Sequence, residues 1–127
     1  MSPAPTLTVY GLAQCDTVKR SRQWLQAHGL NHQFVDFKKA PPSAQQITAW
    51  ADAVGWETLL NKRGTTWRKL DAATQAGVHD AASAVALLVA HPSAIKRPVV
   101  EGGATLLVGF DAAVWGEALS SLAAVAR

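Results

Sequence analysis

Short apolar runs and longer periodic segments alternate along the first third of the chain. Residues 7–10 form a short run of strand-forming side chains that ends at Gly11, which is typical of a buried strand. Residues 18–28 follow a polar turn and stop at Gly29, which brackets a helix of ordinary length. Residues 32–37 partly alternate polar with apolar side chains and predict a second strand. Because a helix separates the two strands, we expect a right-handed βαβ unit.

The middle of the chain has the spacing of helices. Ser43 follows two prolines and is a typical N-cap for a helix over residues 44–54, where apolar side chains recur at helical intervals. Residues 56–60 predict a short helical continuation. Residues 61–69 are polar, contain a glycine and carry four cations, so we expect a loop there. Residues 80–90 predict an alanine-rich helix.

The last third of the chain returns to strand-forming patterns. Residues 94–100 lead into a strand, Gly102-Gly103 predicts a hairpin turn, and residues 105–108 pair back in the antiparallel direction. A final helix is expected over residues 112–125. The order is therefore βαβ, a helical block, then ββα, which predicts an α/β fold class within one domain over residues 1–127.

Composition and cysteine count narrow the class of protein. Apolar residues make up 49% of the 127 residues and charged residues 17%, which is typical of a globular chain. The sequence contains one cysteine, so no internal disulfide can form and a reducing compartment is expected. The chain does not start with a basic segment followed by an apolar stretch, and its most apolar window, residues 81–90, is too short to cross a bilayer. We therefore expect a cytoplasmic monomer without a membrane association.

The charge pattern favours a small anionic ligand over a nucleic acid. The net charge is +3, and the basic residues fall in short groups rather than in one long run. The four histidines show no metal-ligand spacing, so we expect neither a metal site nor a bound cofactor.

Cys15 is the candidate nucleophile. It follows the first strand and a glycine-containing turn, at the start of a helix that Asp16 or Thr17 is expected to cap. Free backbone N–H groups and the positive end of the helix dipole favour a thiolate there, and the Lys19 ammonium adds positive potential one turn later. The alternative is that Cys15 is a small buried apolar residue. Because Val18 stands three residues on, there is no Cys-x-x-Cys pair, and a redox cycle needs a second thiol from outside.

Two arginines are candidate anion-binding groups. Arg63 lies in a Gly-Thr loop, and Arg97 directly precedes Pro98 at the start of a strand. A guanidinium fork suits carboxylates and oxyanions, although an arginine in such a position, taken alone, is more often a solvated surface charge. Pro98 is also a candidate for a cis peptide bond.

Three segments together resemble the ArsC/Spx family, with the closest likeness to its YffB-type reductases. They are VYG…CDTVK over residues 9–19, LNKRGTTWRKL over residues 60–70, and IKRP over residues 95–98. The resemblance covers about residues 7–120, and the three motifs in this order are more specific than any one alone. It implies a thioredoxin-like fold, a mixed four-stranded sheet with a helical insertion before the proline strand.

The resemblance also implies site residues. Cys15 and Arg97 would be catalytic, with Thr17 and Lys19 as groups that activate the thiolate. Matching the Leu59-Leu60 pair to the family places its loop arginine on Asn61. The residues expected to bind the substrate are Asn61, Arg63, Arg97 and Pro98.

Departures from the arsenate reductase pattern favour a larger anionic thiol. Glutaredoxin-linked arsenate reductases have a histidine where this chain has Gly11, and a further arginine where it reads Leu107-Val108-Gly109. We therefore expect a glutathione-dependent thiol/disulfide reductase with a single cysteine, glutathione as co-substrate and glutaredoxin as a further partner. A glutathione/glutaredoxin-linked arsenate reductase is one alternative. An Spx-like regulator that binds RNA polymerase is another, although regulators of that kind commonly use a second cysteine.

Overall fold

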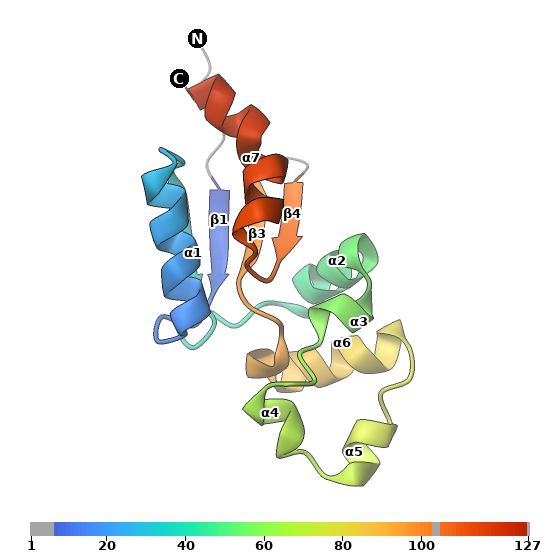
Figure 1. The fold of residues 1–127 in the computed structure, drawn as a ribbon. Helices are drawn as coiled ribbons and strands as arrows, with labels where there is room; N and C mark the ends of the chain where they lie inside the picture. Colours follow the sequence, from blue (N-terminus) through green and yellow to red (C-terminus); the bar gives the residue numbers. More distant parts are fainter. Residues whose placement is uncertain (1–6, 103–104, 127) are drawn as a thin grey trace. The chain divides into compact units, whose positions relative to one another are not determined.

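The computed structural model describes residues 7–102 and 105–126, so the second glycine of the predicted hairpin turn, Gly103, lies outside the described residues. Figure 1 shows the elements along the chain. In chain order they are β1 (Leu7–Gly11), α1 (Asp16–Ala27), β2 (His32–Asp36), α2 (Ala44–Val54), α3 (Trp56–Leu59), α4 (Thr65–Arg68), α5 (Ala72–Ala76), α6 (Ala81–Ala90), the 3₁₀ turn η1 (Pro92–Ala94), β3 (Val99–Gly102), β4 (Thr105–Val108) and α7 (Ala112–Ala126).

The chain divides into two compact units. One consists of Met1–Lys39 with Arg97–Arg127 and is called the sheet unit below; the other is the contiguous segment Ala40–Lys96, called the helical unit. The prediction of one domain over residues 1–127 stays a prediction.

The sheet unit is built on four strands in the order β2-β1-β3-β4. Strands β1 and β2 run parallel with α1 between them in sequence, while β3 pairs antiparallel with both β1 and β4. This arrangement confirms the predicted α/β class, with a mixed four-stranded sheet of the thioredoxin-like type. The pairing of Val9 with Val100 places β1 beside β3, a strand about ninety residues later in the sequence.

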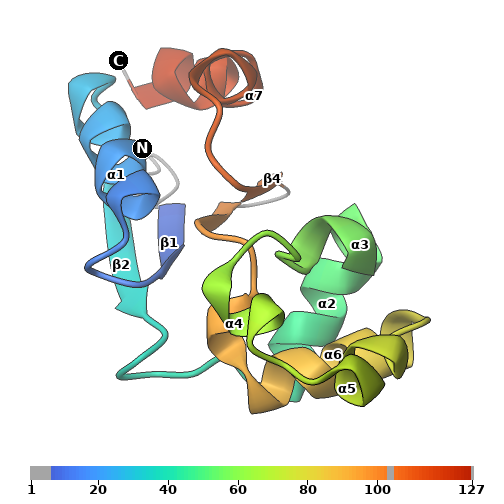
Figure 2. The same cartoon turned by 60° about the horizontal axis from the view of Figure 1, so that its bottom comes forward.

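Helices α1 and α7 cover the same face of this sheet, as Figure 2 shows. Their shared core consists of large apolar side chains from both helices and from β1 and β3. The buried members are Leu7, Val9, Leu25, Leu30, Val100, Trp115 and Leu119. The indole N–H of Trp115 donates to the carbonyl of Gly109 at 3.1 Å, so the buried ring keeps a partner for its one polar group.

Helix α1 buries a stripe of side chains that includes a polar residue, so hydropathy alone does not identify it. The residues of α1 that point into the core are Val18, Ser21 and Leu25, three and four positions apart. Ser21 belongs to the stripe because its hydroxyl donates to the carbonyl of Val18 at 2.7 Å and leaves no unpaired donor in the core. The helix begins at Asp16, two residues earlier than predicted, and ends before Gly29, whose φ of 69° suits glycine.

In the helical unit, α2, α3 and α6 pack around an apolar core of their own. The buried side chains in this segment are Ile47, Trp50, Ala51, Leu59, Leu60, Ala84, Leu87, Leu88, Ala94 and Ile95. An isolated antiparallel bridge joins Leu60 to Ile95, and the Lys96 N–H donates to the carbonyl of Leu59 at 2.7 Å. The C-terminal end of the segment is thereby tied to the end of α3 by backbone hydrogen bonds.

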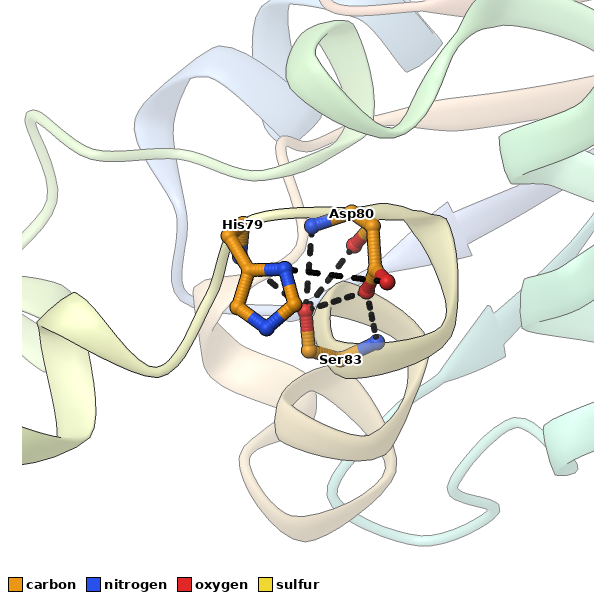
Figure 3. Close-up of polar contacts among 3 residues, drawn as sticks. All are labelled: His79, Asp80 and Ser83. Atoms are coloured by element: carbon orange, nitrogen blue, oxygen red, sulfur yellow. Dashed lines mark hydrogen bonds and ion pairs between the residues drawn. The ribbon is translucent and has the colours of Figure 1, made fainter.

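Helices α2 and α6 begin at side-chain caps. The predicted cap Ser43 accepts from the N–H of Gln46, whose side chain accepts in return from the Ser43 N–H, a reciprocal capping box. Figure 3 shows the equivalent at α6, where Asp80 accepts from the Ser83 N–H at 2.9 Å and His79 lies beside it. The His79, Asp80 and Ser83 side chains are therefore a helix cap, with the histidine Nδ1 3.7 Å from the Asp80 carboxylate.

Residues 61–69 are not the simple loop that the sequence predicts. The four-residue helix α4 forms inside this stretch, after Gly64, and the five-residue α5 follows with Asp71 as its cap. Such short helices carry too few residues to show a periodic pattern, and contacts with neighbouring segments stabilise them. Thr66, for example, shares a 2.7 Å hydrogen bond with Ser93.

No helix in the described residues is long and apolar enough to cross a membrane.

Candidate functional site

Cys15 occupies the N-cap position of α1. Its φ and ψ of –75° and 123° are extended, and the helix begins at the next residue. A turn fixes this position, because the Cys15 N–H donates to the Leu12 carbonyl at 3.0 Å and the Cys15 carbonyl accepts from Lys19 at 3.0 Å. The prediction that Asp16 or Thr17 caps the helix is wrong, because the cap residue is the cysteine itself.

The surroundings of Cys15 favour its thiolate. Partial burial raises the pKa of the thiol, but four contributions oppose it: the backbone N–H of Val18, a hydrogen bond from the Arg97 side chain, the charge of Arg97, and the backbone N–H of Thr17. The balance lowers the pKa of Cys15 below its ordinary value of 9.0. The helix N-terminus and one guanidinium thus act on the same sulfur atom.

Arg97 reaches Cys15 from the far end of the sequence. It lies two residues before β3 and is half-buried, with its Nε atom buried. The peptide bond to Pro98 is cis, as the sequence suggested. The Pro98 carbonyl accepts from the Gly109 N–H at 2.8 Å, which ties this segment to the end of β4. The guanidinium is a fixed positive charge that also has donors suited to an anionic ligand.

Thr17 and Lys19 are the residues predicted to activate the thiolate. Thr17 acts through its backbone N–H, while its hydroxyl lies 3.5 Å from an Arg20 nitrogen. Lys19 is exposed and is not among the groups that shift the pKa of Cys15. Its predicted activating role stays a prediction. The contributor that sequence reasoning missed is Val18; the available signal was its place in the first turn after the cysteine.

The other two predicted ligand residues belong to the helical unit. Asn61 is half-buried and anchored, since its N–H donates to Ala94 at 2.8 Å and its side-chain oxygen accepts from the Arg63 N–H at 3.1 Å. Arg63 itself is exposed. The neighbouring Lys62 ammonium lies over two tryptophan rings, 5.9 Å from the centroid of Trp56 and 5.5 Å from that of Trp67. The substrate-binding roles of Asn61 and Arg63 stay predictions.

Sequence comparison supplies the family. The ArsC family profile matches residues 10–118, a span that includes Cys15, Asn61, Arg63 and Arg97. The chain belongs to the ArsC family. An uncharacterized protein of Haemophilus influenzae is 36% identical over 105 residues, covering 83% of this chain and 91% of the relative.

Two solved structures of similar size resemble this ArsC-family chain closely. One, named YffB, has a TM-score of 0.85 and 42% identity, and covers 89% of this chain and 98% of its own. The other, described as an arsenate reductase (ArsC) related protein from Brucella melitensis, has a TM-score of 0.73 and 42% identity, covering 92% of this chain and 97% of its own. Membership of this family supports thiol-based reductase chemistry in general.

Proposed function

We propose that this protein is a glutathione-dependent thiol/disulfide reductase that works through Cys15. The observation that carries the proposal is the placement of Cys15 at a helix N-terminus, within the same compact unit as Arg97, whose guanidinium lowers the pKa of the thiol. A thiolate is the reactive form in disulfide exchange, and both features favour it. Family membership supports the same chemistry.

The proposed reaction has two exchange steps. In the first, the Cys15 thiolate attacks the glutathione sulfur of a glutathionylated thiol, forming a mixed disulfide and releasing the substrate thiolate. In the second, the thiolate of another glutathione attacks the glutathione sulfur of that mixed disulfide. Oxidised glutathione leaves and the Cys15 thiolate is restored, so electrons and sulfur atoms balance. Because the chain has one cysteine, the second thiol must come from glutathione or from a glutaredoxin partner.

The arginines have different proposed tasks. Arg97 stabilises Cys15 both as the attacking thiolate and as the leaving thiolate of the second step, when the sulfur again carries charge. Asn61 and Arg63 bind a carboxylate of glutathione, and Pro98 presents its backbone to the ligand. We further propose that the protein acts as a monomer in the reducing cytoplasm, with no resident cofactor.

Arsenate reduction is the second candidate. Two structural neighbours favour it: one is described as an arsenate reductase related protein, at 42% identity, and the other as a possible arsenate reductase from Streptococcus mutans, at 26%. Cys15 would then attack arsenate, with glutathione and glutaredoxin completing the reduction. Turnover that depends on arsenate and on both reductants would select this candidate over thiol/disulfide exchange.

The deciding experiment is intact mass after incubation with oxidised glutathione over a pH series. We expect a single glutathione adduct on the wild type at a pH well below the ordinary thiol pKa of 9.0, and none on Cys15→Ser. The same two proteins are then assayed for release of a thiol from a glutathionylated peptide. An adduct that forms only near the ordinary thiol pKa, or full activity in Cys15→Ser, would contradict the proposal and favour a binding role.

A further inference from the structure

The end of strand β1 approaches helix α1 very closely. Gly11 is the last residue of β1, paired with Asp36 of β2, and its carbonyl accepts from the Phe37 N–H at 2.8 Å. A Cβ atom at Gly11 would lie 2.7 Å from Cγ2 of Val18 and 3.4 Å from Cγ1. Real carbon contacts are not that short, so any side chain at residue 11 would have to displace Val18.

Val18 cannot yield easily. Its side chain is 1% exposed, and a β-branched residue in a helix has one strongly preferred rotamer, so rotation of the side chain does not relieve the crowding. Its carbonyl also accepts the Ser21 hydroxyl at 2.7 Å. A side chain at residue 11 would therefore push on the first turn of α1 as a whole.

That turn carries the amide groups that act on the thiol. The N–H of Val18 is the largest of the favourable contributions to the Cys15 thiolate, and the N–H of Thr17 adds to it. We infer that Gly11 is a positioning residue for the Cys15 sulfur, because the missing side chain lets Val18 pack against the end of β1 and so fixes the first turn of α1, which Cys15 caps. This inference rests on the proposed role of Cys15 as the nucleophile.

The alternative is that Gly11 matters for packing alone. In that case Gly11→Ala lowers the stability of the fold without changing how the thiol ionises. The two readings separate when the pH dependence of Cys15 alkylation is measured beside the urea midpoint, since the first reports the thiolate and the second reports the fold.

The test compares wild type, Gly11→Ala, Val18→Ala and the double variant Gly11→Ala/Val18→Ala, alkylated with iodoacetamide across a pH series. In Gly11→Ala we expect the apparent pKa of Cys15 to rise and alkylation below it to slow by about threefold or more. In the double variant the nearest remaining atom of residue 18 is its Cβ, 3.6 Å away, an ordinary contact. The backbone N–H also remains, so the wild-type profile should return.

Gly116→Ala is the matched control. It makes the same change in the sheet unit at a helical glycine, where the nearest atom to a new Cβ is a Trp24 ring carbon at 4.0 Å. Its alkylation profile should equal that of the wild type. An unchanged profile in folded Gly11→Ala, or a double variant that stays shifted, would overturn the inference. If Gly11→Ala does not fold, the double variant decides: a wild-type profile supports the inference and a shifted one refutes it.

Alkylation by iodoacetamide needs no glutathione, so this test is independent of the substrate. A shifted profile in Gly11→Ala with no glutathione adduct on the wild type would sustain the positioning role while the reductase proposal fails. The reverse pattern, a glutathione adduct together with an unchanged profile, would sustain the reductase and refute the positioning role.

Discussion

The two units of this chain reach a buried core by different means. In the sheet unit the core forms from segments far apart in sequence, as when Val9 of β1 pairs with Val100 of β3. In the helical unit the core forms within the contiguous segment Ala40–Lys96, and its helices carry local caps at Ser43, Asp71 and Asp80. Structure that rests on local contacts shows in the sequence pattern, whereas structure that rests on long-range contacts depends on the completed fold.

The two units also differ in how their candidate site residues are held in place. The groups that lower the pKa of Cys15 come from the first turn of α1 and from Arg97, which is far from Cys15 in the sequence. Asn61 and Arg63 are held by hydrogen bonds within their own loop and to Ala94 nearby. The sheet unit therefore tunes a reactive atom, and the helical unit presents exposed cations on a locally fixed loop. Four predictions test this division.

The largest effect is expected in the core of the sheet unit. Trp115→Ala removes a ring that is 1% exposed together with its hydrogen bond to Gly109, and should lower the free energy of unfolding by about 3–5 kcal/mol. Urea denaturation measures this. Val114→Ala is the matched control on the same helix, because its side chain is 54% exposed and should change stability by less than about 0.5 kcal/mol. Equal losses in both variants would contradict the described packing of α7.

The second prediction compares Arg97 of the sheet unit with Arg63 of the helical unit. Arg97→Met removes a hydrogen bond and a positive charge from the thiolate, so the pKa of Cys15 should rise. Alkylation at a pH below that pKa should then slow by about three- to tenfold. Arg63→Met should leave the alkylation profile unchanged and raise the KM for glutathione. If Arg63→Met shifted the profile as much as Arg97→Met, the division of tasks between the units would be wrong.

The third effect concerns the local caps of the helical unit. Ser43→Ala removes the hydroxyl that accepts from the Gln46 N–H at 3.1 Å and should cost about 1 kcal/mol of stability. Ser43→Asp keeps an acceptor at the cap and should retain most of that stability. Thermal and urea unfolding of the two variants measure the difference, while the alkylation profile of Cys15 should stay as in the wild type. A loss as large in Ser43→Asp as in Ser43→Ala would argue against the cap.

The smallest effect is a pH dependence in the sheet unit. Burial and the Arg22 charge lower the pKa of His32 from 6.5, and the Arg22 Nε donates to an unprotonated His32 nitrogen at 3.1 Å. Below 6.5 the unfolded chain therefore binds more protons at this site, so stability should fall as the pH drops from 6.5 through the lowered pKa. In His32→Gln this part of the decline should disappear, as urea midpoints at about pH 5.5 and 7.5 would show. An identical decline in both proteins would refute the assignment to His32.

The local pattern of the sequence determined most of the elements and their order. Helix α2 was predicted at its observed bounds from Ser43 and the spacing of Ile47 and Trp50, because cap and periodicity both lie within the segment. Strand β4 was predicted at its bounds for a similar reason. Cys15 was found as a candidate nucleophile, since a cysteine between a strand and a helix is a local feature.

Only the tertiary structure decided how the surrounding groups act on that cysteine. The IKRP motif already named Arg97 as a candidate, but Arg97 comes near the sulfur through the pairing of β1 with β3, which no local pattern carries. Lys19 is close in sequence and exposed to solvent, whereas the amide of Val18 acts directly on the thiolate. The positioning role of Gly11 depends on the Val18 side chain, which lies against Gly11 only in the folded chain. Sequence specifies residue types and local conformation, but electrostatics and packing at a site act over a few ångströms, and only the folded chain sets those distances.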